Sequence, residues 1–229
     1  MIIDLKFEGK YVVVAGGGSE GYRKTLSFLD AGSRVLVISR TFSSGIRKLY
    51  QMKRIDLIKT EIKEVGQFIN HLSPKPSVLV AATNDRDLNV QLAKHAKEAG
   101  CMVYVVDNPS VSDFIFPALA KIGDVRIAIS TNGKSPAMAR VLRQRIERTI
   151  TQEDLLQIKL QNYARAILRQ RIFDQKVRKK ALYKIIKDDR INRLLKEGKF
   201  DEAQGIAMKI LERFWIDDES YKGPSAVAS

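Results

Sequence analysis

The chain has 229 residues, of which 45% are hydrophobic, and it carries a formal net charge of +14. This length suffices for one large or two modest domains, and no run of about 18 apolar residues is present that would span a membrane. The single cysteine, Cys101, excludes an internal disulfide and a cysteine-based metal cluster, which is typical of a protein of the reducing cytoplasm.

A glycine-rich segment between a short apolar run and a helical pattern is the most informative stretch of the chain. The run Tyr11–Ala15 is uninterrupted and β-branched, as in a strand that is buried on both faces. Gly16, Gly18 and Gly21 follow at G-x-G-x-x-G spacing, and residues 22–31 have a helical pattern. In this order, Gly16 permits a tight turn, Gly18 lets a pyrophosphate approach the backbone, and Gly21 lets the helix pack closely. The segment predicts a dinucleotide site; the alternative is a glycine-rich turn that binds nothing.

Strands and helices alternate along the first half of the chain, which predicts an α/β fold with a Rossmann-type doubly wound parallel sheet. Ligands of such sheets bind at the carboxyl ends of the strands. Thr83 and Asn84 follow one strand and are therefore predicted to contact the cofactor. Further strands are expected over 34–39, 55–62, 77–82 and 102–106, with a helix over 87–100; the strand ends at 16–18, 39–41, 82–85 and 107–109 should meet at one crevice.

The residues after the second strand bear on which dinucleotide binds. An acid at this position favours NAD, because it accepts a hydrogen bond from the ribose hydroxyl. This chain has Arg40 and Thr41 there instead. Arg40 would either face the 2′-phosphate of NADP or stack on the adenine, so both cofactors stay open.

The second half of the chain changes to mostly helical patterns. Two short strands are expected over 114–119 and 125–130, followed by a turn rich in hydroxyl groups and a basic amphipathic helix over 137–150. From residue 152 onward the pattern is helical almost throughout. We expect a Rossmann domain over 1–112, a small α+β region over 113–150, a helical domain over 151–216 and a flexible polar tail over 217–229.

Five segments together carry a resemblance to a known family. In chain order they are GGGSEGYRK, AATND, VYVVDNP, FIFPALA and ISTNGKSPAMARVLRQRIE. Over about residues 1–150 the chain resembles the precorrin-2 dehydrogenase and siroheme synthase family, and the last segment is far more specific than the glycine loop. The resemblance implies a homodimer that oxidises precorrin-2 to sirohydrochlorin with NAD as hydride acceptor, with 113–150 as dimerisation region, and the single cysteine places it in the cytoplasm. Some members of the family then insert ferrous iron to give siroheme.

The resemblance also implies roles for particular positions. Asp107 matches the family aspartate implicated in dehydrogenation and, in bifunctional members, in iron insertion. Ser130 matches a serine near the tetrapyrrole pocket, and positions of the glycine loop and the second strand end match cofactor contacts. Together with the strand-end positions, the predicted cofactor residues are Gly16, Gly18, Ser19, Glu20, Gly21, Arg40, Thr41, Thr83 and Asn84.

The residues by themselves are compatible with this chemistry and leave alternatives. Asp107 ends a strand at the cofactor crevice, where a carboxylate can take up a substrate proton; its alternative role is to cap the turn before Pro109. A substrate with several ring carboxylates needs cations and N–H donors around it. The hydroxyl-rich turn provides them, although it also has the composition of an N-capping turn. The predicted substrate residues are Ser130, Thr131, Lys134, Ser135 and Arg140.

The positive charge admits further interpretations. Basic residues beyond position 160 are expected mainly on a solvated helix face. A non-enzymatic nucleic-acid-binding protein is a remote alternative, which the scarcity of aromatic residues among those cations opposes. His71 and His95 do not form a metal-ligand pair. We therefore expect no resident metal, nucleic acid or membrane as a partner, and ferrous iron only as a substrate.

Overall fold

The computed structural model divides into two compact units, Met1–Phe116 and Pro117–Ser229, and describes residues 2–216. The tail predicted over 217–229 lies outside the described residues. Over residues 2–216, no helix is both long enough and apolar enough to cross a membrane. Each unit has hydrophobic core clusters of its own residues.

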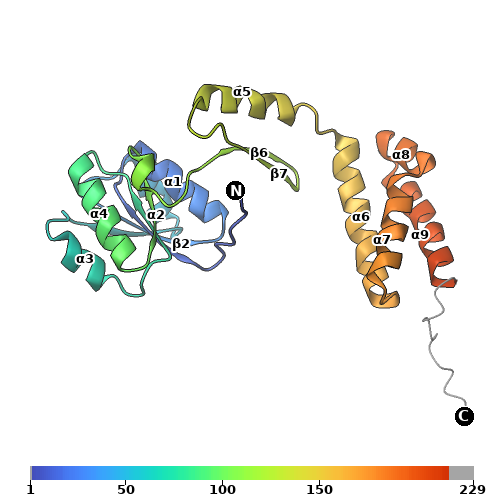
Figure 1. Ribbon diagram of the computed structural model, residues 1–229, viewed down its shortest axis with the longest axis horizontal. Helices are drawn as coiled ribbons and strands as arrows, with labels where there is room; N and C mark the ends of the chain where they lie inside the picture. Colours follow the sequence, from blue (N-terminus) through green and yellow to red (C-terminus); the bar gives the residue numbers. More distant parts are fainter. Residues whose placement is uncertain (1, 217–229) are drawn as a thin grey trace, which may run out of the picture. The chain divides into compact units, whose positions relative to one another are not determined.

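The first unit is built on a five-stranded parallel sheet with the order β3-β2-β1-β4-β5 (Figure 1). The predicted doubly wound parallel sheet is thus confirmed. Its elements are β1 Tyr11–Ala15, α1 Ser19–Asp30, β2 Arg34–Ser39, α2 Ser44–Gln51, β3 Asp56–Lys59, α3 Val65–His71, β4 Val78–Ala81, α4 Arg86–Glu98, β5 Met102–Val105 and the 3-10 helix η1 Pro109–Val111.

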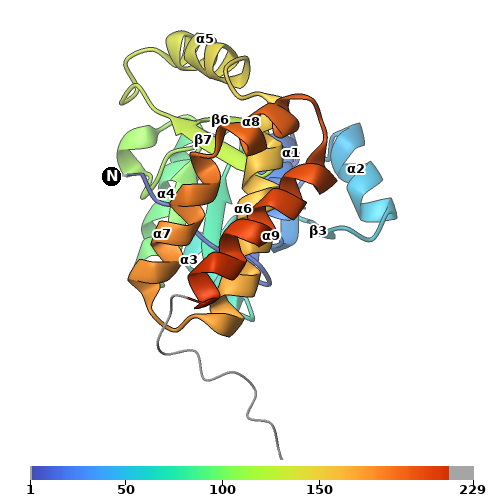
Figure 2. The same cartoon turned by 90° about the vertical axis from the view of Figure 1, so that its right-hand side faces the viewer.

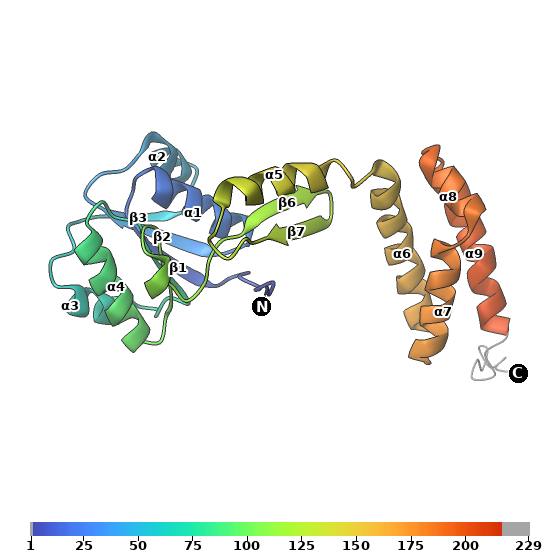
Figure 3. The same cartoon turned by 45° about the horizontal axis from the view of Figure 1, so that its top comes forward.

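Helices cover both faces of this sheet (Figure 3). On one face, Phe28 of α1 and Ile46 of α2 belong to a core cluster with Val12 and Val14 of β1. On the other face, residues of α3 and α4, such as Leu92, cluster with the alternate residues of the strands. Successive side chains of a strand point to opposite faces, and helices cover both faces, so both sets are buried. This explains the contiguous apolar runs of β1, β2, β4 and β5.

The register of the strands brings their carboxyl ends to one edge of the sheet. Ala15 pairs with both Ile38 and Ala81, and Ala81 pairs with Val105. These four residues lie at or next to the ends of β1, β2, β4 and β5. The segments that follow the four strands therefore emerge at the same edge, as the alternation of elements predicts.

Some local predictions differ from the structure. The short helices α2 and α3 are not predicted, because eight and seven residues hold too few turns for a clear periodicity. The strand predicted over 114–119 is wrong in its first part, because β6 begins at Ala118. Phe114 and Phe116 instead pack against the core of the first unit. Apolar residues at alternate positions thus indicate that a segment packs against a core, but they do not show whether it pairs with another strand.

The second unit contains a hairpin, a helix beside it and a group of four helices. The hairpin pairs β6 Ala118–Ile122 with β7 Val125–Ile129, and α5 Pro136–Glu147 packs on it (Figure 3). Helices α6 Gln152–Arg171, α7 Gln175–Ile186, α8 Asp189–Lys196 and α9 Phe200–Ile216 pack against one another (Figure 2). The buried side chains of these four helices form one core, in agreement with the helical pattern of the sequence.

Candidate functional site

The loop between β1 and α1 holds its glycines in different environments. Gly16 has a φ of +123°, and a Cβ atom there would overlap the carbonyl group of Ala82, which follows β4. A Cβ atom at Gly21 would overlap the carbonyl oxygen of Gly16, so this glycine lets α1 pack closely against the turn. A Cβ atom at Gly18 would meet no heavy atom of the described residues within 4 Å. Gly16 and Gly21 therefore serve the turn and the helix packing, whereas Gly18 borders open space.

The N-terminus of α1 is suited to an anion. Gly18 is its N-cap, and within the described part of the chain no side chain caps this helix. The first N–H groups of a helix have no partner within the helix, and together with the helix dipole they attract negative charge. Ser19 and Glu20 begin the helix, and the carboxylate of Glu20 is paired with Arg23 at 2.8 Å. A phosphate group fits the chemistry of this N-terminus.

The segment after β2 lies against the glycine loop. The backbone N–H of Ser43 donates to the carbonyl oxygen of Gly17 at 2.8 Å, and a Cβ atom at Gly17 would overlap the carbonyl oxygen of Thr41. Arg40 is exposed, and its guanidinium lies 3.6 Å from the carboxylate of Glu61, which follows β3. Glu61 is not predicted from the sequence, because β2 and β3 become neighbours only in the sheet.

A buried asparagine links the ends of β4 and β5. Asn89 of α4 is 1% exposed, and its Oδ1 accepts hydrogen bonds from the backbone N–H and the hydroxyl of Thr83, at 3.1 and 2.7 Å. Its Nδ2 donates to the carbonyl oxygen of Thr83 at 3.1 Å and to Oδ1 of Asp107 at 3.2 Å. Oδ2 of Asp107 lies 3.6 Å from Nε of Arg86. Of the predicted residues, Thr83 and Asp107 are thus brought together, and Asn84 is exposed next to them.

Asn89 and Arg86 are not predicted from the sequence. A signal for Asn89 exists, because it lies three and four positions before Leu92 and Ala93, on the buried stripe of α4. A polar side chain on such a stripe needs buried hydrogen-bond partners. The turn before Pro109 is capped by Asn108, whose Oδ1 accepts a hydrogen bond from the N–H of Ser110 at 3.3 Å, rather than by Asp107.

Helix α1 also carries a buried lysine that the sequence does not single out. Lys24 is 7% exposed, and its ammonium lies 3.9 Å from the ring centroid of Phe116 and 4.6 Å from that of Tyr104. Over residues 2–216 it forms no ion pair with a carboxylate. Burial, reinforced by the positive charge of Arg23, lowers the pKa of Lys24 to about 8. The aromatic faces are therefore the main compensation for its charge.

The hydroxyl-rich turn before α5 has the N-capping geometry. The hydroxyls of Ser130, Thr131 and Ser135 each accept a hydrogen bond from a nearby backbone N–H, at 3.1 to 3.2 Å. Each hydroxyl keeps its own hydrogen to donate. Lys134 and Arg140 are exposed, in the turn and on α5. The predicted substrate residues thus form one local cluster of donors in the second unit.

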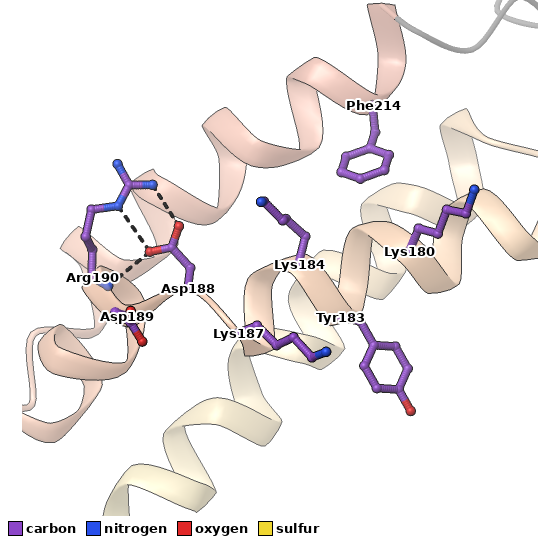
Figure 4. Close-up of a pocket in the computed structure, with 8 residues that line it drawn as sticks. All are labelled: Lys180, Tyr183, Lys184, Lys187, Asp188, Asp189, Arg190 and Phe214. Carbon is purple, nitrogen blue, oxygen red and sulfur yellow. Dashed lines mark hydrogen bonds and ion pairs between the residues drawn. The ribbon is translucent and has the colours of Figure 1, made fainter.

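A cavity of about 660 Å³ lies among the helices of the second unit (Figure 4). Arg190 pairs with Asp188 at 2.7 Å, so this carboxylate is already neutralised. Three lysines of the lining form no ion pair within the described residues, which leaves the cavity positively charged. None of the lining residues is among the predicted site residues. They are Lys180, Tyr183, Lys184, Lys187, Asp188, Asp189, Arg190 and Phe214.

Side chains that could ligate a metal are dispersed. Within the described residues, no three His, Cys, Asp or Glu side chains gather into a group that could hold an ion. His71 Nδ1 lies 2.6 Å from the carbonyl oxygen of Gln67, and His95 Nδ1 lies 3.3 Å from the carboxylate of Glu98. Cys101 is buried, and burial raises the pKa of its thiol.

Two family models match the chain. Residues 3–118 match the family described as "Putative NAD(P)-binding". Residues 123–149 match the family described as "Sirohaem biosynthesis protein central". The first match covers the unit with the glycine loop, and the second covers β7, the hydroxyl-rich turn and α5.

Proteins similar to this chain fall into two length classes. The "Putative precorrin-2 dehydrogenase" of Methanocaldococcus jannaschii is 33% identical over 84% of this chain and 93% of its own length. The "Precorrin-2 dehydrogenase" of Methanosarcina barkeri is 28% identical over 93% of this chain and 94% of its own length. "Siroheme synthase 1" of Aeromonas salmonicida is 30% identical over 95% of this chain, but the chain spans only 44% of that protein.

A solved structure shares the fold. The protein named "SirC, precorrin-2 dehydrogenase" superposes with a TM-score of 0.73. The match covers 91% of this chain and 99% of that protein, at 22% sequence identity. At this identity the likeness establishes the fold of the chain.

Proposed function

The chain belongs to the precorrin-2 dehydrogenase and siroheme synthase family, and we propose that it oxidises precorrin-2 to sirohydrochlorin in siroheme biosynthesis, with NAD as hydride acceptor. One observation carries the proposal beyond the family. The glycine loop and the carboxylate of Asp107 emerge at the same edge of one sheet, where Asn89 ties Asp107 to Thr83. A dehydrogenase of this kind needs a dinucleotide and a proton acceptor side by side.

The residues around the glycine loop fit the pyrophosphate of a dinucleotide. The space beside Gly18 and the N-terminus of α1 without a side-chain cap support this assignment. The backbone N–H groups of Ser19, Glu20 and Gly21 would donate to the phosphates, and Thr41 and Asn84 would flank the cofactor from neighbouring strand ends. Bound NAD would supply the acceptor for the hydride.

The pair of Arg40 and Glu61 supports NAD over NADP. The carboxylate of Glu61, 3.6 Å from the guanidinium, offsets the positive charge that a 2′-phosphate would need. The same carboxylate offers an acceptor for the ribose 2′-hydroxyl, the role that an acid plays in NAD-binding sheets. Both side chains are largely exposed, so we expect a modest preference.

We assign to Asp107 the role of acid–base residue. The oxidation removes a hydride and a proton from the substrate and leaves a new carbon–carbon double bond. The nicotinamide of bound NAD would accept the hydride, and the carboxylate of Asp107 takes the proton and passes it to solvent. Its side chain is 29% exposed, so it is accessible to a substrate while one oxygen is anchored by Asn89.

The ring carboxylates of the substrate need donors and cations. We propose that Ser130, Thr131, Lys134, Ser135 and Arg140 bind them, because these residues combine hydroxyls, two cations and the N-terminus of α5. We also propose a homodimer in which residues 113–150 form the dimer contact, 1–112 bind the cofactor and 151–216 form a helical domain. The molar mass in solution, measured by light scattering, tests the dimer.

Replacement of Asp107 by asparagine tests the proposed function. The variant keeps the size of the side chain and a hydrogen-bond acceptor for Asn89, but it cannot take up a proton. We expect turnover of precorrin-2, followed by absorbance, to fall at least about 100-fold, in line with acid–base catalysis, while NAD binds as in the wild type. Turnover within twofold of the wild type would refute the role of Asp107.

Iron insertion is a second candidate activity. The identity of 30% to a protein named siroheme synthase favours it. Asp107 would then accept pyrrole protons as the metal enters. Incubation of the full chain with sirohydrochlorin and ferrous or cobalt ion, without NAD, tests this activity separately. Absence of metal insertion would leave the dehydrogenase as the single activity.

A further inference from the structure

The two carboxylate oxygens of Asp107 have unequal partners. Oδ1 accepts a hydrogen bond from Nδ2 of Asn89, a side chain that is 1% exposed. Oδ2 faces Nε of Arg86 at 3.6 Å, and the side chain of Arg86 is 88% exposed. Oδ1 is therefore held by a buried side chain, whereas Oδ2 faces an exposed arginine at the surface.

The amide of Asn89 is held in a single orientation. Its Oδ1 accepts two hydrogen bonds from Thr83, and its Nδ2 donates to two acceptors, the carbonyl oxygen of Thr83 and the carboxylate of Asp107. A flipped amide would place its oxygen against these two acceptors and its NH₂ group against the backbone N–H of Thr83. An asparagine amide offers one acceptor oxygen and two N–H donors, so this arrangement uses all of its hydrogen-bonding groups.

The pair of Arg86 and Asp107 is weak by comparison. Its separation of 3.6 Å exceeds that of a good charge-assisted hydrogen bond, which is about 2.7–2.9 Å. Ion pairs with one largely exposed partner contribute about 0–1 kcal/mol, because water competes for both groups. Arg86 can therefore exchange Asp107 for another carboxylate without a large cost.

We propose that Asn89 is a positioning residue that anchors Asp107 through Oδ1 and so makes Oδ2 the reacting oxygen, while Arg86 leaves Oδ2 to bind a carboxylate of the substrate. This inference rests on the proposed function. In the step, a substrate C–H bond breaks and its proton forms a bond to Oδ2, while a second C–H bond gives its hydride to the nicotinamide. Before this step, on substrate binding, Arg86 exchanges Oδ2 for a substrate carboxylate.

Replacement of Asn89 by alanine tests the positioning role. The variant removes the donor to Oδ1, so we expect kcat to fall about tenfold and NAD affinity to stay within twofold. The KM for precorrin-2 should change less than twofold, because loss of the donor to Oδ1 misplaces the proton acceptor without removing a contact that binds the substrate. The charged side chains at the start of α4, those of the N-cap residue Asp85, Arg86 and Asp87, are unchanged in this variant.

A merely structural role of Asn89 gives a different result. It would lower the unfolding midpoint and the amount of active enzyme while kcat per NAD-binding molecule stayed at the wild-type value, and that outcome overturns the inference. Wild-type activity of Asn89→Ala overturns it too. Wild-type turnover by Asp107→Asn would refute the acid–base role of Asp107, and absence of precorrin-2 turnover by the unmodified chain would refute the proposed function, so these failures are distinguishable from that of the inference.

Replacement of Arg86 by glutamine tests the exchange and does not depend on a buried side chain. We expect the KM for precorrin-2 to rise at least fivefold, kcat to change less than twofold, and Arg86→Lys to restore part of the affinity. Lys94→Gln is the matched control, because it removes one exposed positive charge from the same helix. An unchanged KM in Arg86→Gln, or an equal rise in Lys94→Gln, overturns the inference.

Discussion

Replacement of Lys24 by methionine removes the buried charge of the first unit and keeps the length of an unbranched side chain. In the wild type the ammonium lies against the rings of Phe116 and Tyr104 and is 7% exposed. Burial, with Arg23 nearby, lowers the pKa of Lys24 from 10.5 to about 8, and Glu20 opposes this shift. The lysine is therefore charged in the fold at neutral pH and pays a desolvation penalty there.

The sign of the pH dependence follows from these two pKa values. Between about pH 8 and 10.5 the unfolded chain binds more protons at this site than the folded chain does, so stability rises with pH over that window. Below about pH 8 the penalty is present in full. Between pH 7 and pH 9.5, the free energy of unfolding should gain roughly 1.36 kcal/mol for each pH unit above the folded pKa, or about 2 kcal/mol. This is an upper value, because the aromatic faces favour the charged form.

Urea unfolding of wild type and Lys24→Met at pH 7 and 9.5 measures this gain. The difference between the two pH values should be about 2 kcal/mol more favourable in the wild type, and other titrating groups cancel in the comparison. Far-UV circular dichroism follows the whole chain, and fluorescence of Trp215, the single tryptophan, reports on the second unit as an internal control. Equal pH dependence in the two proteins would refute the reasoning about Lys24.

Two further predictions concern the cofactor site. Gly18→Val should leave the unfolding midpoint nearly unchanged, because a Cβ atom there meets no described atom within 4 Å. The same variant should show no NAD binding in calorimetry. Gly21→Ala should instead destabilise the fold, because its Cβ atom would overlap the carbonyl oxygen of Gly16. Retained NAD affinity in Gly18→Val would contradict a pyrophosphate at this position. Glu61→Gln should free Arg40 and raise kcat/KM with NADP relative to NAD about threefold, the scale of a weak exposed pair. An unchanged ratio of the two cofactors would remove this pair from the site.

The sheet and the glycine loop could be predicted because their signals are local. Strands β1, β2, β4 and β5 each contain a contiguous apolar run, and each helix of sufficient length repeats its apolar positions within a few turns. The roles of Gly16 and Gly21 also follow from local spacing, and the overlaps that a Cβ atom would cause agree with them. The short helices α2 and α3 escaped prediction because periodicity needs length.

The sequence by itself determined the parallel α/β architecture, the glycine turn and the presence of an aspartate at the end of β5, because each of these depends on residues that are adjacent or a few positions apart. Only the tertiary structure decided the partners. Asn89 and Asp107 are hydrogen-bonded although they are 18 positions apart in the chain. Arg40 and Glu61 are paired because they follow the neighbouring strands β2 and β3. The ammonium of Lys24 lies over the ring of Phe116, which is the last residue of the first unit in the sequence. Such contacts depend on the order in which strands enter the sheet, and hydrophobic periodicity is the same for every order of strands that buries the same faces.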